Sequence, residues 1–238
     1  MLDIWAMYWK ECKELYFQGN RAVLLFLLVV ASLGIWLPFQ VGQAWLDLPL
    51  IAVLLLAIGP VLFTFPFTAD SFAGERERHT LESLLATSLS DGSIIAGKIA
   101  ALLTMSWVMT LTSLLAGFAV ANIHANGHLW SFYSPDRLLM TVLLSLTFSV
   151  LLITIGILIS LRATTVRQAQ QILGSSIAVL GLASSLLSTQ LAHLPFVIQL
   201  QGFSEGEILP LMIGCTALLD VLLILFVQKR FQRSRLIL

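Results

Sequence analysis

Long apolar stretches recur along the chain, and short polar segments separate them. Six of these stretches reach about 20 residues, which is the helical length that crosses roughly 30 Å of hydrocarbon. Their apolar residues run continuously, without the two-residue alternation of membrane β-barrel strands. The pattern therefore predicts an all-α integral membrane protein with six transmembrane helices, at residues 21–39, 48–67, 99–121, 138–161, 172–188 and 208–227.

The composition supports a membrane location. Hydrophobic residues make up 58% of the 238 residues and charged residues only 11%, and the mean hydropathy of +0.93 is far too high for a soluble domain. The connections between the predicted spans are short, so we expect a single transmembrane domain over residues 1–238. The first apolar stretch follows a segment that contains Asp3, Glu11 and Glu14, which indicates a retained span rather than a signal peptide.

The basic residues predict an orientation. Lys and Arg near the ends of spans concentrate on the cytoplasmic side of membranes. Of the 13 Lys and Arg residues, all but Arg137 fall in the terminal segments or in the loops that follow the second and fourth spans. We therefore expect a multi-pass protein of the cell membrane with both termini in the cytoplasm, which an even number of spans also requires.

The segment before the first span has two different sides. Residues 1–20 place aromatic side chains at helical spacing and charged side chains opposite them. This pattern predicts an amphipathic interfacial helix, lying in the plane of the membrane surface. The aromatic side carries Trp5, Tyr8, Trp9, Cys12 and Tyr16, and the charged side carries Lys10, Glu11, Lys13 and Glu14.

Two predicted spans carry stripes of small residues, which let membrane helices approach closely. Such stripes serve packing within one chain or contact with a second subunit, and the sequence leaves both uses open. The second span region contains Pro49, Pro60 and Pro66, so we expect a kinked helix there. The stripes are Ser145, Ser149, Gly156 and Ser160 in the fourth span and Gly174, Ala178, Gly181 and Ser185 in the fifth.

Two further features lie in the last third of the chain. Residues 189–207 contain an apolar run too short to cross a membrane, which indicates a loop or a re-entrant segment in the outer leaflet. Asp220 lies well inside the last span, where an ionisable side chain faces protein or water and is functional by default. It lines a transport path on that interpretation; the alternative is a protonated Asp that is hydrogen-bonded to Thr216 or to a neighbouring helix.

Motifs for catalysis or cofactor binding are weak. The stretch "GSIIAGKI" nearly matches the phosphate-binding loop, but Ile99 cannot bind magnesium and no strand precedes it. His124 and His128 have a metal-like spacing but flank a turn-forming Asn-Gly pair without further ligands. Cys12 and Cys215 imply no disulfide. We therefore expect no catalytic residue, metal or cofactor on this chain, which disfavours an intramembrane enzyme.

Charged residues gather in one predicted cytoplasmic segment, "GERERHTLE" at residues 74–82. Behind the charges, Leu81, Leu84 and Leu85 recur at i, i+3 and i+4, which predicts an apolar stripe on a short helix. We interpret this stripe as a docking surface. The alternative is a solvated loop with internal helix pairs.

This segment resembles a known one. "AGERERHTLESLLATSLSDGSIIAGK", residues 73–98, is similar to the cytoplasmic coupling segment of ATP-binding-cassette (ABC) transporter permeases of the type 2 exporter family. Those permeases commonly show E-x-E-R-G-T-L-E, then Leu-Leu, a Pro-x-Ser turn and a Gly-Lys that opens the third span. His79 stands at the usual Gly and Ser88 at the usual Pro, two departures that affect the local bends. The matching residues are Glu75, Glu77, Arg78, Thr80, Leu81, Glu82, Leu84, Leu85, Ser90, Gly97 and Lys98.

The resemblance implies a permease subunit of an exporter that works by alternating access. A separate ATPase subunit, which binds ATP and Mg, would dock on a coupling segment at residues 70–98, and a second permease subunit would complete a homodimer or a heterodimer. The apolar spans favour amphipathic cargo, and no nucleic acid is expected as a partner. The rival interpretation is a membrane scaffold or assembly subunit without transport activity. The implied ATPase contacts are Glu75, Arg76, Glu77, Arg78, Thr80, Leu81, Glu82, Leu84 and Leu85.

Overall fold

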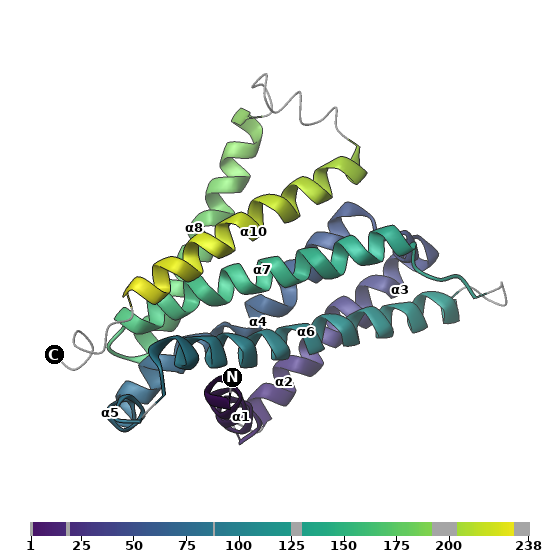
Figure 1. Cartoon of the computed structure of the whole chain (residues 1–238). Helices are drawn as coiled ribbons and strands as arrows, with labels where there is room; N and C mark the ends of the chain where they lie inside the picture. Colours follow the sequence, from purple (N-terminus) through teal and green to yellow (C-terminus); the bar gives the residue numbers. More distant parts are fainter. Residues whose placement is uncertain (1, 18–19, 88, 125–129, 192–203, 231–238) are drawn as a thin grey trace.

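The computed structural model describes the whole chain except residues 1, 18–19, 88, 125–129, 192–203 and 231–238, and the described part contains helices and no strands (Figure 1). This confirms an all-α fold. The elements are α1 (Leu2–Phe17), α2 (Asn20–Val29), η1 (Val30–Trp36), α3 (Leu37–Val41), η2 (Gly42–Asp47), α4 (Leu50–Glu77), α5 (Leu81–Leu85), α6 (Asp91–His124), α7 (Pro135–Arg162), α8 (Val166–Leu191) and α10 (Glu205–Arg230).

Among the described residues, five helical segments are long and apolar enough to cross a membrane. They cover five of the six predicted spans. The remaining prediction, at residues 172–188, falls within α8, which is not one of the five segments, so the structure does not confirm the count of six. In Figure 1, α8 leans away from α7 and α10. The five segments are Val23–Asp47, Leu50–Glu77, Asp91–Ile123, Pro135–Arg162 and Gly206–Val227.

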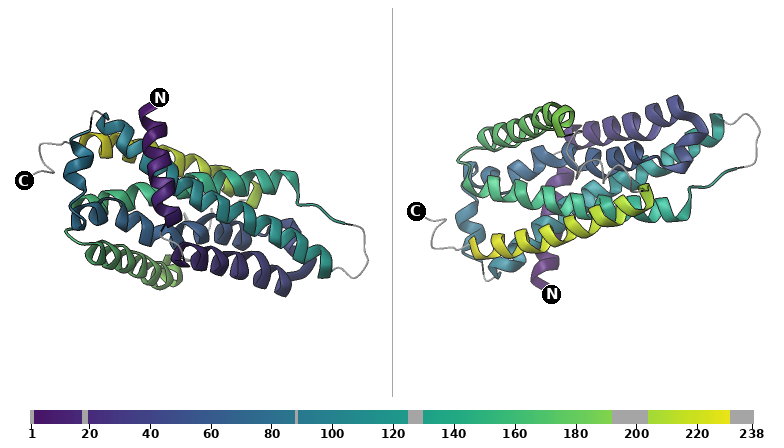
Figure 2. Two further views of the ribbon diagram at one scale, coloured as in Figure 1. Left: turned by 90° about the horizontal axis from the view of Figure 1, so that it is seen from below. Right: turned by 90° about the horizontal axis from the view of Figure 1, so that it is seen from above.

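Helix α4 lies at the centre of the bundle, where it contacts α6, α7 and α8. Helix α10 packs on α7, and α1 packs on α6. Figure 2 shows that α1 crosses the direction of the long helices, as an interfacial helix would. Buried apolar side chains such as Phe72, Ile94 and Ile153 form the core between α4, α6 and α7.

The loops that were predicted to share one side do lie together. The ends of α4, α7 and α10, the beginnings of α6 and α8, and all of α5 meet at one end of the bundle (Figure 1). We call this the basic end. It carries Arg76, Arg78, Lys98, Arg162 and Arg167.

At the opposite end of the bundle, the chain turns sharply between the first two spans. Leu48 has a φ of 46°, in the left-handed region that side chains with a Cβ rarely adopt. Its carbonyl accepts a hydrogen bond from the Nη1 of Arg137 at 3.3 Å. Pro49 follows as the N-cap of α4, and this helix continues through Pro60 and Pro66. Arg137, the one basic residue predicted on this side, thus stabilises a turn.

The small residues of α7 pack within the chain. The hydroxyl groups of Ser149 and Ser106 on α6 lie 3.0 Å apart. Ser160 accepts hydrogen bonds from the backbone N–H groups of Phe72 and Ala73 at 3.1 and 3.0 Å. Of the two alternatives for this stripe, the structure supports internal packing, which also buries its other members, Ser145 and Gly156.

The stripe on α8 is different. Gly174 and Ala178 are exposed, and a side chain at Gly174 would meet nothing within 4 Å. The side chains of Ser185 and its neighbours, and the position of Gly181, lie outside the residues whose burial the structure describes. These two exposed positions therefore leave room for a second subunit.

Candidate functional site

The segment at residues 70–98 forms the basic end between α4 and α6. Helix α4 continues to Glu77, the chain turns at 78–80, and α5 follows. His79 has a φ of 55°. The residue at the usual Gly position therefore adopts the left-handed conformation that Gly favours, and the bend forms despite the substitution. Hydrogen bonds close the turn, from the N–H of Thr80 to the Glu75 carbonyl at 2.9 Å and from Arg78 to Gly74 at 3.0 Å.

Several charges of this segment bind the chain itself. Arg76 donates to the carbonyls of Leu161 and Ala163, which end α7. Glu77 accepts from the N–H of Val166, the first residue of α8, at 3.0 Å. These charges therefore hold the end of α4 against the α7–α8 connection, although they were predicted as partner contacts.

The most buried charge at this end is Lys98, which has no exposed surface. Its Nζ lies 2.8 Å from Oε1 of Glu11 and 3.2 Å from Oε1 of Glu75. It also donates to the carbonyl of Ser71 at 2.7 Å. Lys10 contacts the same Glu75 oxygen at 2.6 Å. This buried ion network, Lys10, Glu11, Glu75 and Lys98, joins α1, α4 and α6.

The network is electrostatically balanced in its core, where two ammonium groups meet two carboxylates. Desolvation of ions is costly, so each buried charge depends on its partners. Burial alone would lower the pKa of Lys10, but the hydrogen bond to Glu75 and the attraction of Glu11, Glu75 and Glu14 outweigh it and raise this pKa. The Lys10 amine is therefore protonated and positively charged at neutral pH.

Three carboxylates lie close enough to share a metal ion: those of Glu11, Glu14 and Glu75 offer oxygens within 4.8 Å of one another. The Lys10 ammonium already contacts all three, at 3.4, 3.1 and 2.6 Å. Since it supplies the positive charge, the cluster has the chemistry of an ion network rather than a metal centre.

Helix α1 turns an unexpected side to the bundle. The predicted helix is present, and Trp5 and Trp9 are exposed and stacked at 6.3 Å. Met7 and Glu11, one turn apart, are buried instead. The expectation that the charged side faces water is wrong at Glu11, because Lys98 on α6 provides its counter-charge. At the contact, a side chain on Gly97 would come within 2.6 Å of Met7.

Two leucines of α5, Leu81 and Leu84, are buried. Leu81 and Leu84 are only 5% and 8% exposed and belong to the same core cluster as Met7. The prediction of an outward apolar surface is wrong for these two residues, because α5 lies against the bundle and buries its apolar side there. The side chain of Leu85 lies outside the described ones. The outward positions are Glu82, Ser83, Ala86 and Thr87.

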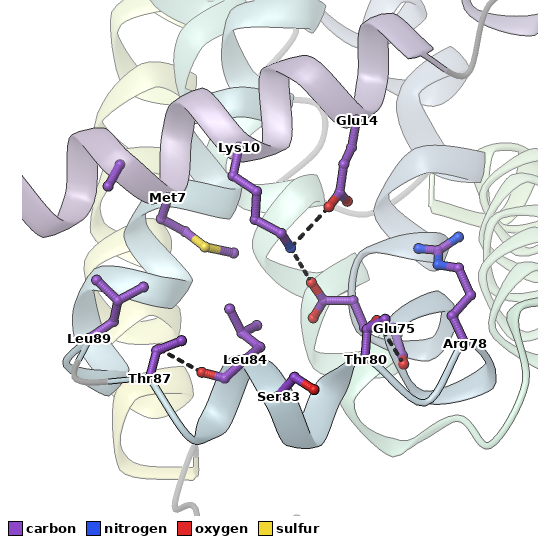
Figure 3. Close-up of a pocket in the computed structure, with 11 residues that line it drawn as sticks. Met7, Lys10, Glu14, Glu75, Arg78, Thr80, Ser83, Leu84, Thr87 and Leu89 are labelled. Atoms are coloured by element: carbon purple, nitrogen blue, oxygen red, sulfur yellow. Dashed lines mark hydrogen bonds and ion pairs between the residues drawn. The ribbon is translucent and has the colours of Figure 1, made fainter.

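A hollow of about 540 Å³ lies between α1 and α5. Figure 3 shows Lys10 of α1 and Glu75 of α4 meeting on one side, while Met7 and Leu84 point into the gap from opposite helices. Among the described atoms, Oε2 of Glu75 has no hydrogen-bond partner. The hollow thus combines an apolar floor with charged walls, which suits the side of a partner helix. Its lining comprises Ala6, Met7, Lys10, Glu14, Glu75, Arg78, Thr80, Ser83, Leu84, Thr87 and Leu89.

The other predicted positions do not join this site. Asp220 is buried on α10, and its Oδ1 has no hydrogen-bond partner among the described atoms. The hydrogen bond between Asp220 and Thr216, one of the alternatives considered, is not formed: the Thr216 hydroxyl instead contacts the Met212 carbonyl at 2.8 Å and the Thr147 hydroxyl at 2.9 Å. Asp220 therefore stays a candidate transport residue, which the structure does not test.

The weak motifs lead to no site either. In the near match to a phosphate-binding loop, the lysine is Lys98, whose ammonium is committed to the buried ion network. Ser90 instead accepts a bond from the N–H of Ser93 at the start of α6, at 3.2 Å. His128 and the side chain of His124 lie outside the described residues. Cys12 and Cys215 are both free.

Sequence reasoning missed the buried ion network. It assigned Lys98 to the Gly-Lys pair that opens the third span and Glu11 to the charged side of the interfacial helix. A signal was available, since Lys98 lies inside an apolar helical run that continues past it, where an unpaired charge is costly. That signal points to a carboxylate partner without identifying it.

The comparisons with known proteins agree with the geometry. A family model described as "ABC-2 family transporter protein" matches residues 40–204, more than half of the chain. A search among curated proteins finds no match. The matched region includes the central helix α4, the bend at His79, α5 and the beginning of α6, which form the candidate site. The chain belongs to the ABC-2 family of transporter proteins, as a membrane permease of an ABC transporter.

Proposed function

We propose that this chain is the permease subunit of an ABC exporter, which moves cargo out of the cytoplasm by alternating access. A separate ATPase subunit binds ATP and Mg and docks on the coupling segment at the basic end. Family membership supports the permease role and implies an ATPase partner. The observation that carries the docking proposal is the buried ion network, because it fixes α1 to α4 and α6 at the end of the bundle where α5 lies.

The network gives the proposed motion a physical route. Force applied to α5 passes to α4 through the short turn at His79 and to α6 through the chain that follows α5. Glu75 and Lys98 form an ion pair below the surface. If α4 and α6 separated there, both charges would lose their partner while still buried, which is costly. The basic end therefore transmits a push from the ATPase to both helices together.

The structure changes which residues we assign to docking. The contact surface consists of the outward side of α5, the exposed residues before it and the rim of the hollow between α1 and α5. In a helix-in-groove contact, buried anchors determine affinity and exposed charges at the rim set the register. The assigned residues are Arg78, His79, Glu82, Ser83, Ala86 and Thr87.

Orientation and assembly complete the proposal. The protein lies in the cell membrane with its basic end facing the cytoplasm, because Lys and Arg near span ends stay on that side. Both termini are cytoplasmic as well. A second copy of the permease completes a homodimer, for which the exposed Gly174 and Ala178 on α8 allow close approach. The apolar character of the spans favours amphipathic cargo.

A pull-down tests the docking surface. A candidate ABC ATPase, sought among the genes beside this one, is co-expressed with the tagged permease, and Ser83→Trp is compared with Ile123→Trp. Ser83 is exposed on α5, and Ile123 is exposed at the end of α6 that is remote from α5. We expect Ser83→Trp to abolish co-purification and Ile123→Trp to preserve it. Retention of the ATPase by Ser83→Trp would contradict the assigned surface.

A further inference from the structure

A second cavity, of about 680 Å³, opens between α2, α4 and α8. Its size falls within the range of small-molecule sites. It lies apart from the hollow between α1 and α5, and Arg78 is the residue common to both. Its lining comprises Asn20, Leu24, Leu25, Pro66, Phe67, Asp70, Arg78, Val166 and Gln170.

The predicted span ends place this cavity at the boundary between hydrocarbon and headgroups. The sequence predicts that the first span begins at residue 21, the second ends at residue 67 and the fifth begins at residue 172, and each of these positions is within two residues of one that lines the cavity. Its apolar residues from α2 and α4 lie within those spans, whereas its polar residues lie beyond them. The polar ones are Asn20, Asp70, Arg78 and Gln170.

Two opposite charges line the polar part. An Nη atom of Arg78 lies 3.3 Å from a carboxylate oxygen of Asp70. The Arg78 side chain is 51% exposed and that of Asp70 is 20% exposed, so both charges are accessible from the cavity. In a ligand that carries both a negative and a positive group, the negative group can contact Arg78 and the positive group can contact Asp70, so that no like charges meet.

We propose that this cavity binds a zwitterionic phospholipid with a primary ammonium group, of the phosphatidylethanolamine class. The phosphate contacts Arg78, the ammonium donates to Asp70, and an acyl chain lies over Leu24, Leu25 and Phe67. Planar guanidinium groups are suited to phosphate oxygens, and an ammonium offers three donors to a carboxylate.

Other headgroups fit less well. Phosphatidylglycerol also carries a phosphate for Arg78, but it offers Asp70 only the neutral hydroxyl groups of its glycerol, where phosphatidylethanolamine offers a charged ammonium. Phosphatidylcholine carries a positive charge but no N–H donor for the Asp70 carboxylate. The cavity therefore selects by headgroup charge and by hydrogen bonding, while the apolar wall accepts any of these acyl chains.

The test measures lipid binding to the full chain purified in detergent, without an ATPase. The protein is mixed with equimolar phosphatidylethanolamine and phosphatidylglycerol of identical acyl chains, and native mass spectrometry counts the bound lipids. We expect phosphatidylethanolamine to be favoured about fivefold, as for a partly exposed charge pair. Asp70→Asn, which removes the charge but keeps the shape, should abolish or reverse this preference. The exposed Arg167, outside the cavity lining, provides the control Arg167→Gln, which should preserve it.

A second pair of variants tests the acyl wall and does not depend on the folding of Asp70→Asn. Leu24→Trp should reduce binding of both lipids about fivefold without changing their ratio, because it fills the apolar part of the cavity. Leu27→Trp, at an equally exposed position of α2 outside the lining, should bind like the unchanged protein. Equal binding of the two lipids by the unchanged protein would overturn the proposal, as would a ratio that Asp70→Asn leaves intact, or equal effects of the two tryptophans. Since no ATPase takes part, the lipid-binding result does not depend on whether the docking proposal is correct.

Discussion

Lys98 shows how strongly one residue can depend on distant partners. Its ammonium is buried between Glu11 and Glu75, which belong to two other helices. We predict that Lys98→Met destabilises the protein by about 3–5 kcal/mol, because it removes the fully buried cation and leaves the two buried carboxylates with only the partly exposed Lys10 as a counter-charge. Thermal unfolding in detergent, with Lys13→Met on the exposed side of α1 as the control, measures the loss. An equally small effect of both variants would show that the network is not holding α1 in place.

The same network predicts a dependence on pH. Because the pKa of Lys10 is raised above its ordinary 10.5, its pairing contributes stability that is present in full below that value and is lost as pH rises through the folded pKa. The difference in melting temperature between the unchanged protein and Lys10→Gln should therefore be similar at neutral pH and at about pH 10. It should shrink only in stronger alkali. A difference that is already gone near pH 9, where a lysine is still protonated, would contradict this assignment.

His79 adopts the left-handed conformation at the position where the family pattern has Gly. This conformation costs a residue with a Cβ about 1–2 kcal/mol, while Gly loses more chain entropy on folding. We therefore predict that His79→Gly stabilises the protein by about 0.5–1 kcal/mol and that His79→Ala does not. Melting temperatures of the two variants measure the difference. A lower melting temperature for His79→Gly than for His79→Ala would argue against strain at this bend.

At the scale of elements, α5 folds inward. Leu84 lies in the core cluster, so Leu84→Asp would bury a charge without a partner and should destabilise the protein by several kcal/mol. Ser83→Asp, one residue away on the exposed side, should fold normally. Size-exclusion profiles of the purified variants show the difference. A monodisperse Leu84→Asp variant would mean that α5 leaves the bundle readily.

The sequence predicted where the helices lie along the chain better than it predicted which side of each helix is buried. Continuous apolar runs predicted the five segments that are long and apolar enough to cross a membrane, and amphipathic spacing predicted the helix α1, because both patterns are local properties of the sequence. The inward turn of Leu81 and Leu84 depends on what packs against α5. The pairing of Glu11 with Lys98 joins residues 87 positions apart. A local pattern predicts neither the burial of these leucines nor this ion pair. Charged residues in a short segment are ordinarily interpreted as exposed to solvent.

At the scale of the whole molecule, the features of the proposed site gather at one end. The bend at His79, the outward side of α5 and the buried ion network lie at the basic end, while Arg137 and the turn at Leu48 lie at the other. The resemblance found in residues 73–98 and the family match over residues 40–204 agree on the same region. The proposal that follows is a permease moved from its basic end by an ATPase.

ATP hydrolysis in proteoliposomes tests this central claim most directly. The ATPase that co-purifies with the permease is reconstituted with the unchanged permease, with Ser83→Trp or with Ile123→Trp, and the rate of phosphate release is measured. We predict that the unchanged permease and Ile123→Trp increase the rate to the same level and that Ser83→Trp, although folded, leaves it at the level of the ATPase alone. The same rate with all three permeases would contradict coupling through α5.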